Sequence, residues 1–188
     1  MRIIAGKHKG RKIEVGKDPN REIRPTSEFA REAIFNILMH SKHITPEQSF
    51  IGKPVLDVFC GTGAFGLEAL SRGAAQVTFV DQSREAMAAA RYNAERMGEL
   101  DHVDFYLTDA SKLGRAKKRY GLVFLDPPYF EKLVEPTLKA LQTGGWLEEG
   151  ALVIVEHDAK ENITLPAPFT LLDERRYGRA LIRVLKAN

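Results

Sequence analysis

The sequence predicts an α/β fold in which a mostly parallel sheet carries helices on both faces. From Pro54 onward, short apolar runs alternate with stretches of helical spacing, a pattern typical of repeated β-α-β units. After Pro168 the pattern changes to two strand-like segments separated by Tyr177 and Gly178, which indicates a terminal hairpin. The sheet is therefore expected to end with an antiparallel strand, and 188 residues suit a single domain of this kind.

The first fifty residues precede this alternation and are expected to form an extension, 1–50, of a core at 51–188. Residues 2–15 alternate around Gly6 and Gly10, which predicts a short β-hairpin or two strands. Glycines suit the turns because they adopt backbone conformations that other residues avoid.

A helix is expected next, after a polar loop that runs from residue 17 to residue 25. Thr26 or Ser27 is a suitable cap, and Glu28 places an acid in the first turn. Apolar residues then recur on one face as far as Leu38, so this helix is predicted to pack against the core.

The core itself is predicted to contain strands and helices in alternation. The strands are apolar runs of five residues or so, and the helices are longer stretches between them. The expected strands are Val55–Phe59, Val77–Asp81, Val103–Leu107, Leu122–Asp126, Leu152–Glu156, Phe169–Asp173 and Ala180–Leu185. The expected helices lie near Gly66–Ser71, Arg84–Met97 and Lys132–Leu141.

The composition excludes several classes of protein. No apolar run approaches the ~20 residues that span a bilayer, and the basic N-terminus is unlike a signal peptide. The single cysteine, Cys60, excludes an internal disulfide and a multi-cysteine zinc site, and the five histidines show no metal spacing. Cys60 has no base beside it in sequence and is expected to be a small buried residue rather than a nucleophile. We expect a cytoplasmic protein with no metal and no membrane partner.

Positive charge is concentrated near the N-terminus, although the formal net charge is only +3. Residues 1–12 contain five cations and no acid, and three arginines follow by residue 31. Such a cluster is the electrostatic footprint expected for a phosphate backbone, while a solvated surface is the simpler alternative. The cations are Arg2, Lys7, Lys9, Arg11, Lys12, Arg21, Arg24 and Arg31.

A glycine-rich turn follows the first strand of the core. Gly61, Gly63 and Gly66 have the G-x-G-x-x-G spacing, which lets a ligand approach the backbone but is a weak signal alone. Asp57 lies four residues before the first glycine, where a carboxylate would repel the pyrophosphate of a dinucleotide. The same carboxylate would attract the ammonium and sulfonium groups of S-adenosylmethionine, so the pattern favours that cofactor.

Acids also end the next two strands. Asp81 is placed to accept hydrogen bonds from two ribose hydroxyls, and Asp109 from an adenine amino group, although each acid alone could be an ordinary cap residue. Three acids at successive strand ends mark the carboxyl edge of a parallel sheet, where open α/β sheets bind ligands. The residues expected to contact the cofactor are Asp57, Phe59, Cys60, Gly61, Gly63, Asp81, Gln82, Asp109 and Ala110.

The fourth strand ends in the motif Asp126-Pro127-Pro128-Tyr129. An exocyclic amine on a base is a poor nucleophile because its lone pair is delocalised into the ring. Two acceptors, the Asp126 carboxylate and the Pro127 carbonyl, would draw its protons and bias the nitrogen toward sp³. Tyr129 offers a face for stacking. The motif predicts methyl transfer to an unpaired or flipped base, against the alternative of a proline-rich turn.

Several stretches of the chain match one known family over nearly the full length. They are Arg2–Gly6, Lys9–Lys12, Arg24–Thr26, Arg31–Leu38, Asp57–Ala74, Asn93, Asp126–Tyr129 and Tyr177–Gly178. On these residues the chain resembles the bacterial 16S ribosomal RNA guanine-N2 methyltransferases of the RsmD type. It departs from them at Cys60, where alanine is more usual, and at Arg179, where a smaller acidic residue is more usual.

The resemblance implies a Rossmann-like class I methyltransferase fold with a seven-stranded sheet. It also implies that a monomer methylates N2 of one guanine in 16S rRNA, within the small ribosomal subunit, with Asp126, Pro127, Pro128 and Tyr129 as catalytic residues. The expected RNA contacts are Arg2, Lys7, Lys9, Arg11, Lys12, Arg24, Thr26, Arg31 and Tyr177.

Three other functions are compatible with parts of the sequence. A DNA adenine-N6 methyltransferase would use the same chemistry, but it normally needs a target-recognition domain for which this chain has little room. A nicotinamide-dependent oxidoreductase would use the glycine-rich turn, but Asp57 and the Asp126–Tyr129 motif argue against it. A non-catalytic RNA-binding protein would use the basic N-terminus alone.

Overall fold

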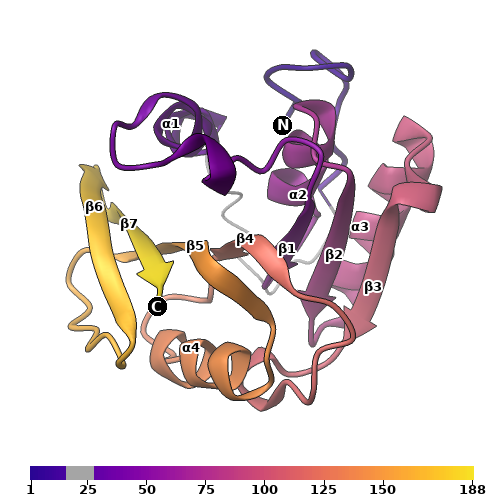
Figure 1. Ribbon diagram of the computed structural model, residues 1–188. Coiled ribbons are helices and arrows are strands. Elements are labelled where there is room, and N and C mark those ends of the chain that lie inside the picture. Colours follow the sequence, from indigo (N-terminus) through magenta and orange to yellow (C-terminus); the bar gives the residue numbers. More distant parts are fainter. Residues whose placement is uncertain (16–27) are drawn as a thin grey trace.

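The computed structural model describes residues 1–15 and 28–188 and contains a seven-stranded sheet (Figure 1). The strand order is β3-β2-β1-β4-β5-β7-β6, with β1 to β5 parallel and β7 antiparallel to both of its neighbours. The predicted parallel sheet with a closing hairpin is confirmed. The strands are β1 (Pro54–Val58), β2 (Gln76–Asp81), β3 (Val103–Leu107), β4 (Tyr120–Leu125), β5 (Leu147–Asp158), β6 (Phe169–Tyr177) and β7 (Ala180–Ala187).

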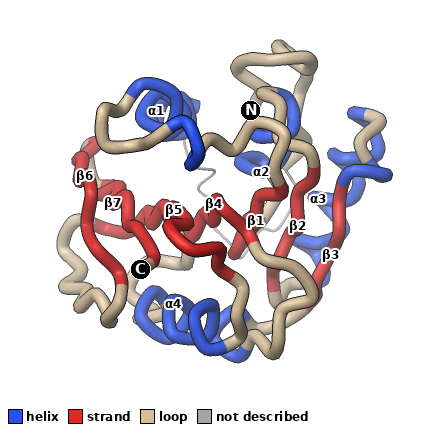
Figure 2. The backbone as a smooth tube through the Cα atoms, viewed as in Figure 1, coloured by secondary structure: helices blue, strands red, loops and turns tan. Residues whose placement is uncertain are grey.

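Helices cover both faces of the sheet, as predicted. Figure 2 shows α4 on the opposite side of the strands from α1 and α2. One hydrophobic cluster lies between the sheet and α1, α2 and α3, and a second lies between the sheet and α4. None of the helices in the described part of the chain is long and apolar enough to cross a bilayer. The helices are α1 (Glu28–His40), α2 (Ala64–Ser71), α3 (Arg84–Met97) and α4 (Val134–Thr143).

Local sequence signals explain where the best-predicted elements begin and end. The Ser83 side chain caps α3 by accepting a hydrogen bond from the Ala86 amide, and Gly98 ends the helix in a left-handed conformation. Strand β5 starts five residues before the predicted run because Leu147 already pairs with Tyr120, although this first part of the strand is only partly buried. Apolar runs therefore locate the buried part of a strand and miss its exposed end.

Stacked aromatic rings attach α1 to the sheet. The Phe65 ring on α2 lies between Phe35 of α1 and Phe124 of β4, with centroid separations of 4.9 and 4.0 Å. All three side chains are buried, and burying each such ring contributes roughly 2 kcal/mol. The extension at 1–50 therefore shares one hydrophobic cluster with the sheet. Its division from the core at 51–188 stays a prediction.

The N-terminal arm, residues 1–15, forms a hairpin-like loop rather than two strands. One antiparallel bridge joins Arg2 to Lys12, while Ile3 and Ile13 insert into the core. Gly6 is required because the arm passes so close to α2 that a Cβ there would lie 1.7 Å from the Ser71 carbonyl oxygen. The loop predicted at 17–25, the cap at Thr26 or Ser27, and Arg24 lie outside the described residues.

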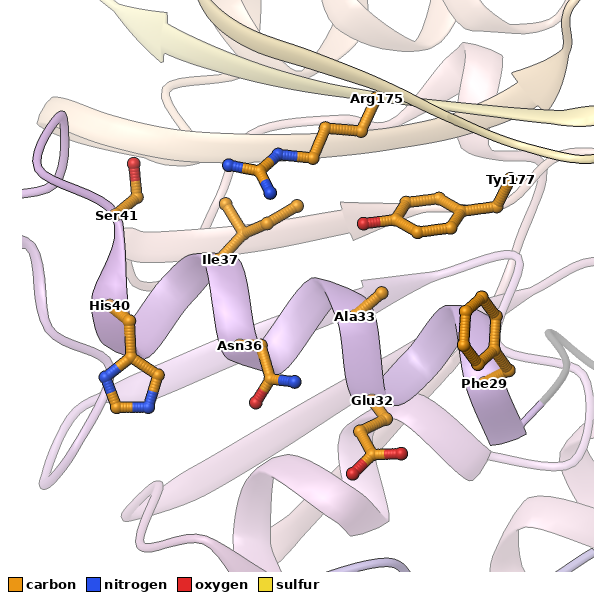
Figure 3. A pocket seen from close by; sticks show the side chains of 9 residues that line it. All are labelled: Phe29, Glu32, Ala33, Asn36, Ile37, His40, Ser41, Arg175 and Tyr177. Carbon is orange, nitrogen blue, oxygen red and sulfur yellow. The ribbon is translucent and has the colours of Figure 1, made fainter.

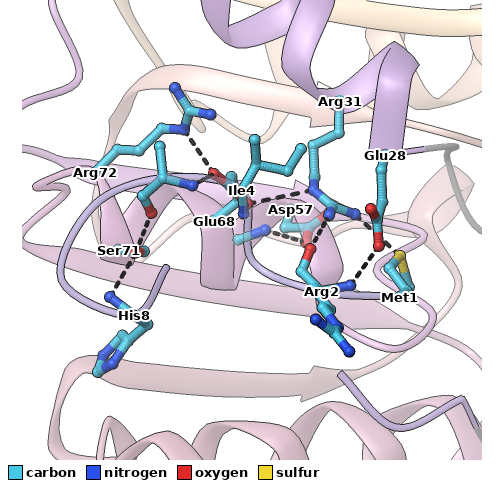
Figure 4. A network of polar contacts seen from close by, with 12 residues as sticks. Met1, Arg2, Ile4, His8, Glu28, Arg31, Asp57, Glu68, Ser71 and Arg72 are labelled. Carbon is cyan, nitrogen blue, oxygen red and sulfur yellow. Dashed lines mark hydrogen bonds and ion pairs between the residues drawn. The ribbon is translucent and has the colours of Figure 1, made fainter. Parts of the chain in front are cut away.

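A buried carboxylate fastens this arm to α2 (Figure 4). Glu68 is fully buried and accepts hydrogen bonds from the backbone amides of Ile4 and Ala5, at 2.8 and 3.0 Å. The same carboxylate receives the Arg72 side chain at 2.7 Å and that of Arg31 at 3.5 Å. Two cations and two backbone amides thus compensate the negative charge of Glu68, which offsets the cost of burying it.

The prediction that Arg31 contacts RNA is wrong for this structure. Its side chain has no exposed surface, because the α1 face that carries it packs against the arm and α2. The guanidinium donates a hydrogen bond to the Arg2 carbonyl at 2.5 Å and lies beside Glu68. Arg31 is a buried structural partner, and its charge is not available to a phosphate.

We expect Glu68→Ala to lower the free energy of unfolding by about 3–5 kcal/mol, because it leaves Arg31 buried without its carboxylate. Urea unfolding followed by circular dichroism measures this loss, and limited proteolysis should show faster cleavage within residues 1–15.

The matched control for this change is Glu174→Ala. Glu174 also pairs with an arginine, Arg183, at 2.7 Å, but the glutamate is 39% exposed. Removal of this carboxylate should lower the free energy of unfolding by at most about 1 kcal/mol. Equal losses in the two variants would contradict the proposed anchoring role of Glu68.

Candidate active site

The two motif loops leave neighbouring strands side by side. In the parallel pairing of β1 with β4, Val58 is the partner of Leu125, and these are the last residues of the two strands. The Asp126 amide donates a hydrogen bond to the Val58 carbonyl at 3.4 Å. The glycine-rich turn and the Asp126–Tyr129 motif are therefore neighbours at the carboxyl edge of the sheet.

The loop after β1 has an unusual backbone. Phe59, Gly61 and Gly63 all adopt left-handed conformations, with φ of 62°, 53° and 77°. Such a conformation strains Phe59, and strain of this kind is concentrated at functional sites. Apart from Gly61 and its two chain neighbours, no described residue has an atom within 4 Å of the position of a Cβ on Gly61, whereas a Cβ on Gly66 would lie 2.5 Å from the Phe79 ring. Gly61 thus leaves room for a ligand, and Gly66 permits close packing of α2 on the sheet.

Asp57 lies inside the fold rather than on an open surface. It is 1% exposed, and its Oδ2 accepts a hydrogen bond from the Gly66 amide at 2.9 Å. Burial, followed by the nearby charges of Asp126 and Asp81, raises the pKa of Asp57 well above its usual range. Cys60 is buried as expected, and burial also raises the pKa of its thiol, so it is a poor nucleophile.

The carboxylate of Asp81 connects the β2 end to the glycine-rich turn. Its Oδ2 accepts a hydrogen bond from the Gly61 amide at 3.1 Å, and its Oδ1 accepts one from Ser83 at 2.8 Å. Each oxygen retains a second lone pair for a ligand hydroxyl. The neighbouring Gln82 side chain is exposed.

Asp109 caps a short 3-10 helix, Ala110–Lys112. Its Oδ1 accepts hydrogen bonds from the amide and the hydroxyl of Ser111, at 2.9 and 2.7 Å. These contacts lower the pKa of Asp109. Asp109 therefore acts as a helix cap in this structure. The next residue, Ala110, is buried. A contact between Asp109 and adenine stays a prediction.

The Asp126–Tyr129 loop is partly buried and is held from two sides. Pro127 is buried, Pro128 is exposed, and the Tyr129 hydroxyl donates a weak hydrogen bond to Glu156 at 3.4 Å. The guanidinium of Arg179, from the turn between β6 and β7, lies 5.6 Å from the centre of the Tyr129 ring. The terminal hairpin therefore reaches the motif loop through Arg179.

Glu156, two residues before the end of β5, is a further candidate site residue, which the sequence analysis did not assign. It is 5% exposed, and its Oε2 has no hydrogen-bond partner among the described residues. Burial, followed by the charge of Asp126, raises the pKa of Glu156 to about 9. The available signal was its place as an acid at the end of an apolar run, the same signal that identified Asp81.

The RNA-binding residues predicted in the arm remain on the surface. Lys9 is exposed, while Lys7 pairs with Glu99 and Arg11 with the Arg96 carbonyl. Arg2 and Lys12 are also exposed. Asn93 joins this arm to the glycine-rich turn by donating hydrogen bonds to the Glu14 and Thr62 carbonyls, both at 3.0 Å.

Tyr177 lies apart from the motif loops, in an open groove of about 610 Å³ between α1 and β6 (Figure 3). Its ring meets the Phe29 ring edge-on, with centroids 5.7 Å apart. Arg175 lines the same groove. None of the predicted catalytic or cofactor residues contributes to this lining. A contact between Tyr177 and RNA stays a prediction. No cluster of metal-ligating side chains occurs within residues 1–15 and 28–188.

The fold and the paired strand-end motifs define a Rossmann-like methyltransferase. A family model described as Conserved hypothetical protein 95 matches residues 1–186, and the chain belongs to this family, the RsmD family. Ribosomal RNA small subunit methyltransferase D of Escherichia coli is 31% identical over 98% of this chain and 88% of the relative. The protein of the same name from Haemophilus influenzae is 31% identical over 95% of this chain and 89% of its own.

A solved structure has the same architecture. That of yhhF from Escherichia coli superposes with a TM-score of 0.83 at 30% sequence identity, and it covers 100% of this chain and 98% of its own.

The raised pKa of Glu156 predicts a pH dependence of stability. Because its ordinary pKa is 4.5, the folded state binds more protons than the unfolded state between about pH 5 and pH 9. The stability that the neutral Glu156 contributes is present at low pH, falls as the pH rises above about 5, and is lost once the pH has passed about 9. We expect Glu156→Gln, which cannot ionise, to escape the loss.

The measurement is the melting temperature of wild type and variant across this pH range. The wild-type value minus that of Glu156→Gln should fall by a few degrees as the pH rises. The exposed-carboxyl control Glu174→Gln should run parallel to the wild type. Parallel curves for all three proteins would contradict a neutral Glu156.

Proposed function

We propose that the protein transfers a methyl group from S-adenosylmethionine to the exocyclic N2 amine of a guanine in 16S ribosomal RNA. One observation carries this proposal: the strained glycine-rich turn and the Asp126–Tyr129 motif leave adjacent parallel strands side by side. The first loop suits the cofactor and the second suits an amine on a base, so a methyl donor and its acceptor would meet between them.

The residues at the β1 end fit this cofactor. Burial raises the pKa of Asp57, and the nearby charges of Asp126 and Asp81 raise it further, so a cationic ligand would relieve the repulsion that these two acids exert on Asp57. The open space beside Gly61 allows close approach to the backbone. When bound, S-adenosylmethionine supplies an electrophilic methyl group.

The Asp126–Tyr129 motif prepares the amine for attack. The Asp126 carboxylate and the Pro127 carbonyl accept hydrogen bonds from the two amine protons, which orients the nitrogen lone pair away from the ring. As positive charge develops on N2, Asp126 stabilises it and receives the proton that is released. Tyr129, held between Glu156 and Arg179, positions the base by stacking.

The exposed cations of the arm are proposed to bind the phosphate backbone. These five cations lie on the arm, which is attached to α2 through Glu68 and to the glycine-rich turn through Asn93. RNA bound to this arm would therefore be placed relative to the site. The names of the relatives from Escherichia coli and Haemophilus influenzae support small-subunit ribosomal RNA as the substrate. A cytoplasmic location follows from that substrate.

Transfer of radiolabelled methyl tests the proposed reaction. Small ribosomal subunits from cells that lack the modification, naked rRNA and duplex DNA are offered in parallel, and the labelled nucleoside is identified after digestion. N2-methylguanosine from rRNA is the expected product. N6-methyladenine from DNA would replace the proposed substrate, and no labelled nucleic acid at all would overturn the proposal.

We expect Asp126→Ala to reduce methyl transfer by about a thousandfold or more, because it removes an acceptor that acts on the developing charge. The dissociation constant of S-adenosylmethionine, measured by calorimetry, should change by only about threefold, because Asp126 belongs to the base side of the site. Equal loss of cofactor binding and transfer would contradict the division into two half-sites.

We also expect removal of three arm charges, by Lys9→Ala, Arg11→Ala and Lys12→Ala together, to weaken RNA binding and flatten its salt dependence. The slope of log K against log salt should decrease by about two to three. The matched control removes Arg115, Lys117 and Arg119, three exposed cations in the loop before β4. If the control alone changes the slope, the RNA footprint lies elsewhere.

A further inference from the structure

Sheet geometry places a second carboxyl group beside Asp126. Leu125 pairs with Val155 in the parallel register of β4 and β5, so Asp126 and Glu156 come next on neighbouring strands. Phe124 and Ile154 pack toward the α1–α3 side of the sheet, and Leu125 and Val155 toward α4. The alternation of side chains therefore directs Asp126 and Glu156 to the same face and the same level.

The Glu156 carboxyl group is buried but incompletely hydrogen-bonded, as expected of a group that binds a ligand. Only 5% of the residue's surface is exposed, yet its Oε2 has no hydrogen-bond partner in the described part of the chain. Its Oε1 receives one weak hydrogen bond, from the Tyr129 hydroxyl at 3.4 Å. A buried polar atom without a partner costs roughly 1–3 kcal/mol, so a carboxyl retained here for stability alone would be unfavourable.

We propose that Glu156 reads the ring edge of the target base, pairing with N1–H and O6 of guanine while Asp126 holds the N2 amine. This inference rests on the proposed function and assigns the residue that selects guanine. On guanine, N2, N1 and O6 lie in a row along one edge, and two carboxyl groups in a row on adjacent strands match that order. Tyr129, in contact with Glu156, supplies the stacking face for the same base.

A neutral carboxyl group suits this edge better than an ionised one. It accepts from N1–H through its carbonyl oxygen and donates its own proton to O6, whereas a carboxylate can only accept. The pKa of about 9 keeps Glu156 neutral at physiological pH, because burial and the charge of Asp126 both oppose ionisation. With its amine at Asp126, adenine would offer only N1 to this group and would lose one of the two hydrogen bonds.

The inference is tested by a cycle that changes the side chain and the base edge separately. Small subunits are reconstituted with 16S rRNA in which the methylated guanine, mapped with the wild-type enzyme, is kept or replaced by 2-aminopurine. That base keeps the N2 amine but lacks both O6 and N1–H. The kcat/KM for methyl transfer is measured for wild type, Glu156→Ala and Glu156→Gln on both substrates.

We expect the wild type to prefer guanine over 2-aminopurine by about tenfold to a hundredfold, the discrimination of a bidentate pair. Glu156→Ala should lose most of that preference, because its kcat/KM falls much further on guanine than on 2-aminopurine, which offers the carboxyl group only N1. Glu156→Gln should restore most of it, because the amide also presents one acceptor and one donor.

Two results would overturn the inference while leaving the proposed function intact. In the first, Glu156→Ala lowers transfer to both bases by the same factor, as a residue that merely supports Tyr129 would. In the second, Glu156→Gln is as poor on guanine as Glu156→Ala. Failure of the proposed function is seen separately, because the wild type would then methylate no guanine in the unmodified subunits. Melting temperatures confirm that each variant is folded.

Discussion

The parallel pairing of β1 with β4 is the constraint on which the candidate site depends. It brings two chain segments together that are separated by more than sixty residues, and it fixes their register at Val58 and Leu125. A slip of one residue would turn Asp126 toward α4 and away from Asp57. The aromatic stack from α1 through α2 to Phe124 holds the same strand two residues before the motif begins.

The carboxyl edge of this sheet brings several carboxyl groups together in a buried place. Asp57 and Asp81 accept hydrogen bonds from backbone amides, and Glu156 remains neutral through burial and the proximity of Asp126. Such an edge repels phosphate and favours a cationic ligand. The cations exposed on the N-terminal arm are separate from it, so the charges suited to RNA and those suited to the cofactor occupy different elements.

Much of the fold was predictable because its signals are local. Ser83 and Gly98 mark the start and the end of α3, and apolar runs locate the five parallel strands. The placement of Arg31 was not predictable, because an arginine on a helix shows in sequence neither its burial nor its distant carboxylate, Glu68. Glu156 was missed for a related reason: its significance comes from the level it shares with Asp126 across β4 and β5, and register is a property of the folded sheet.

We propose that the ends of β1 and β4 form one site for a methyl donor and a base. A crystal structure of the protein soaked with S-adenosylmethionine is the most direct test of this arrangement. We expect the cofactor beside Gly61, with its ribose at Asp81 and its methyl group directed toward Asp126. A cofactor bound elsewhere, such as in the groove beside Tyr177, or one whose methyl group points away from Asp126, would show that the two strand ends do not form one site.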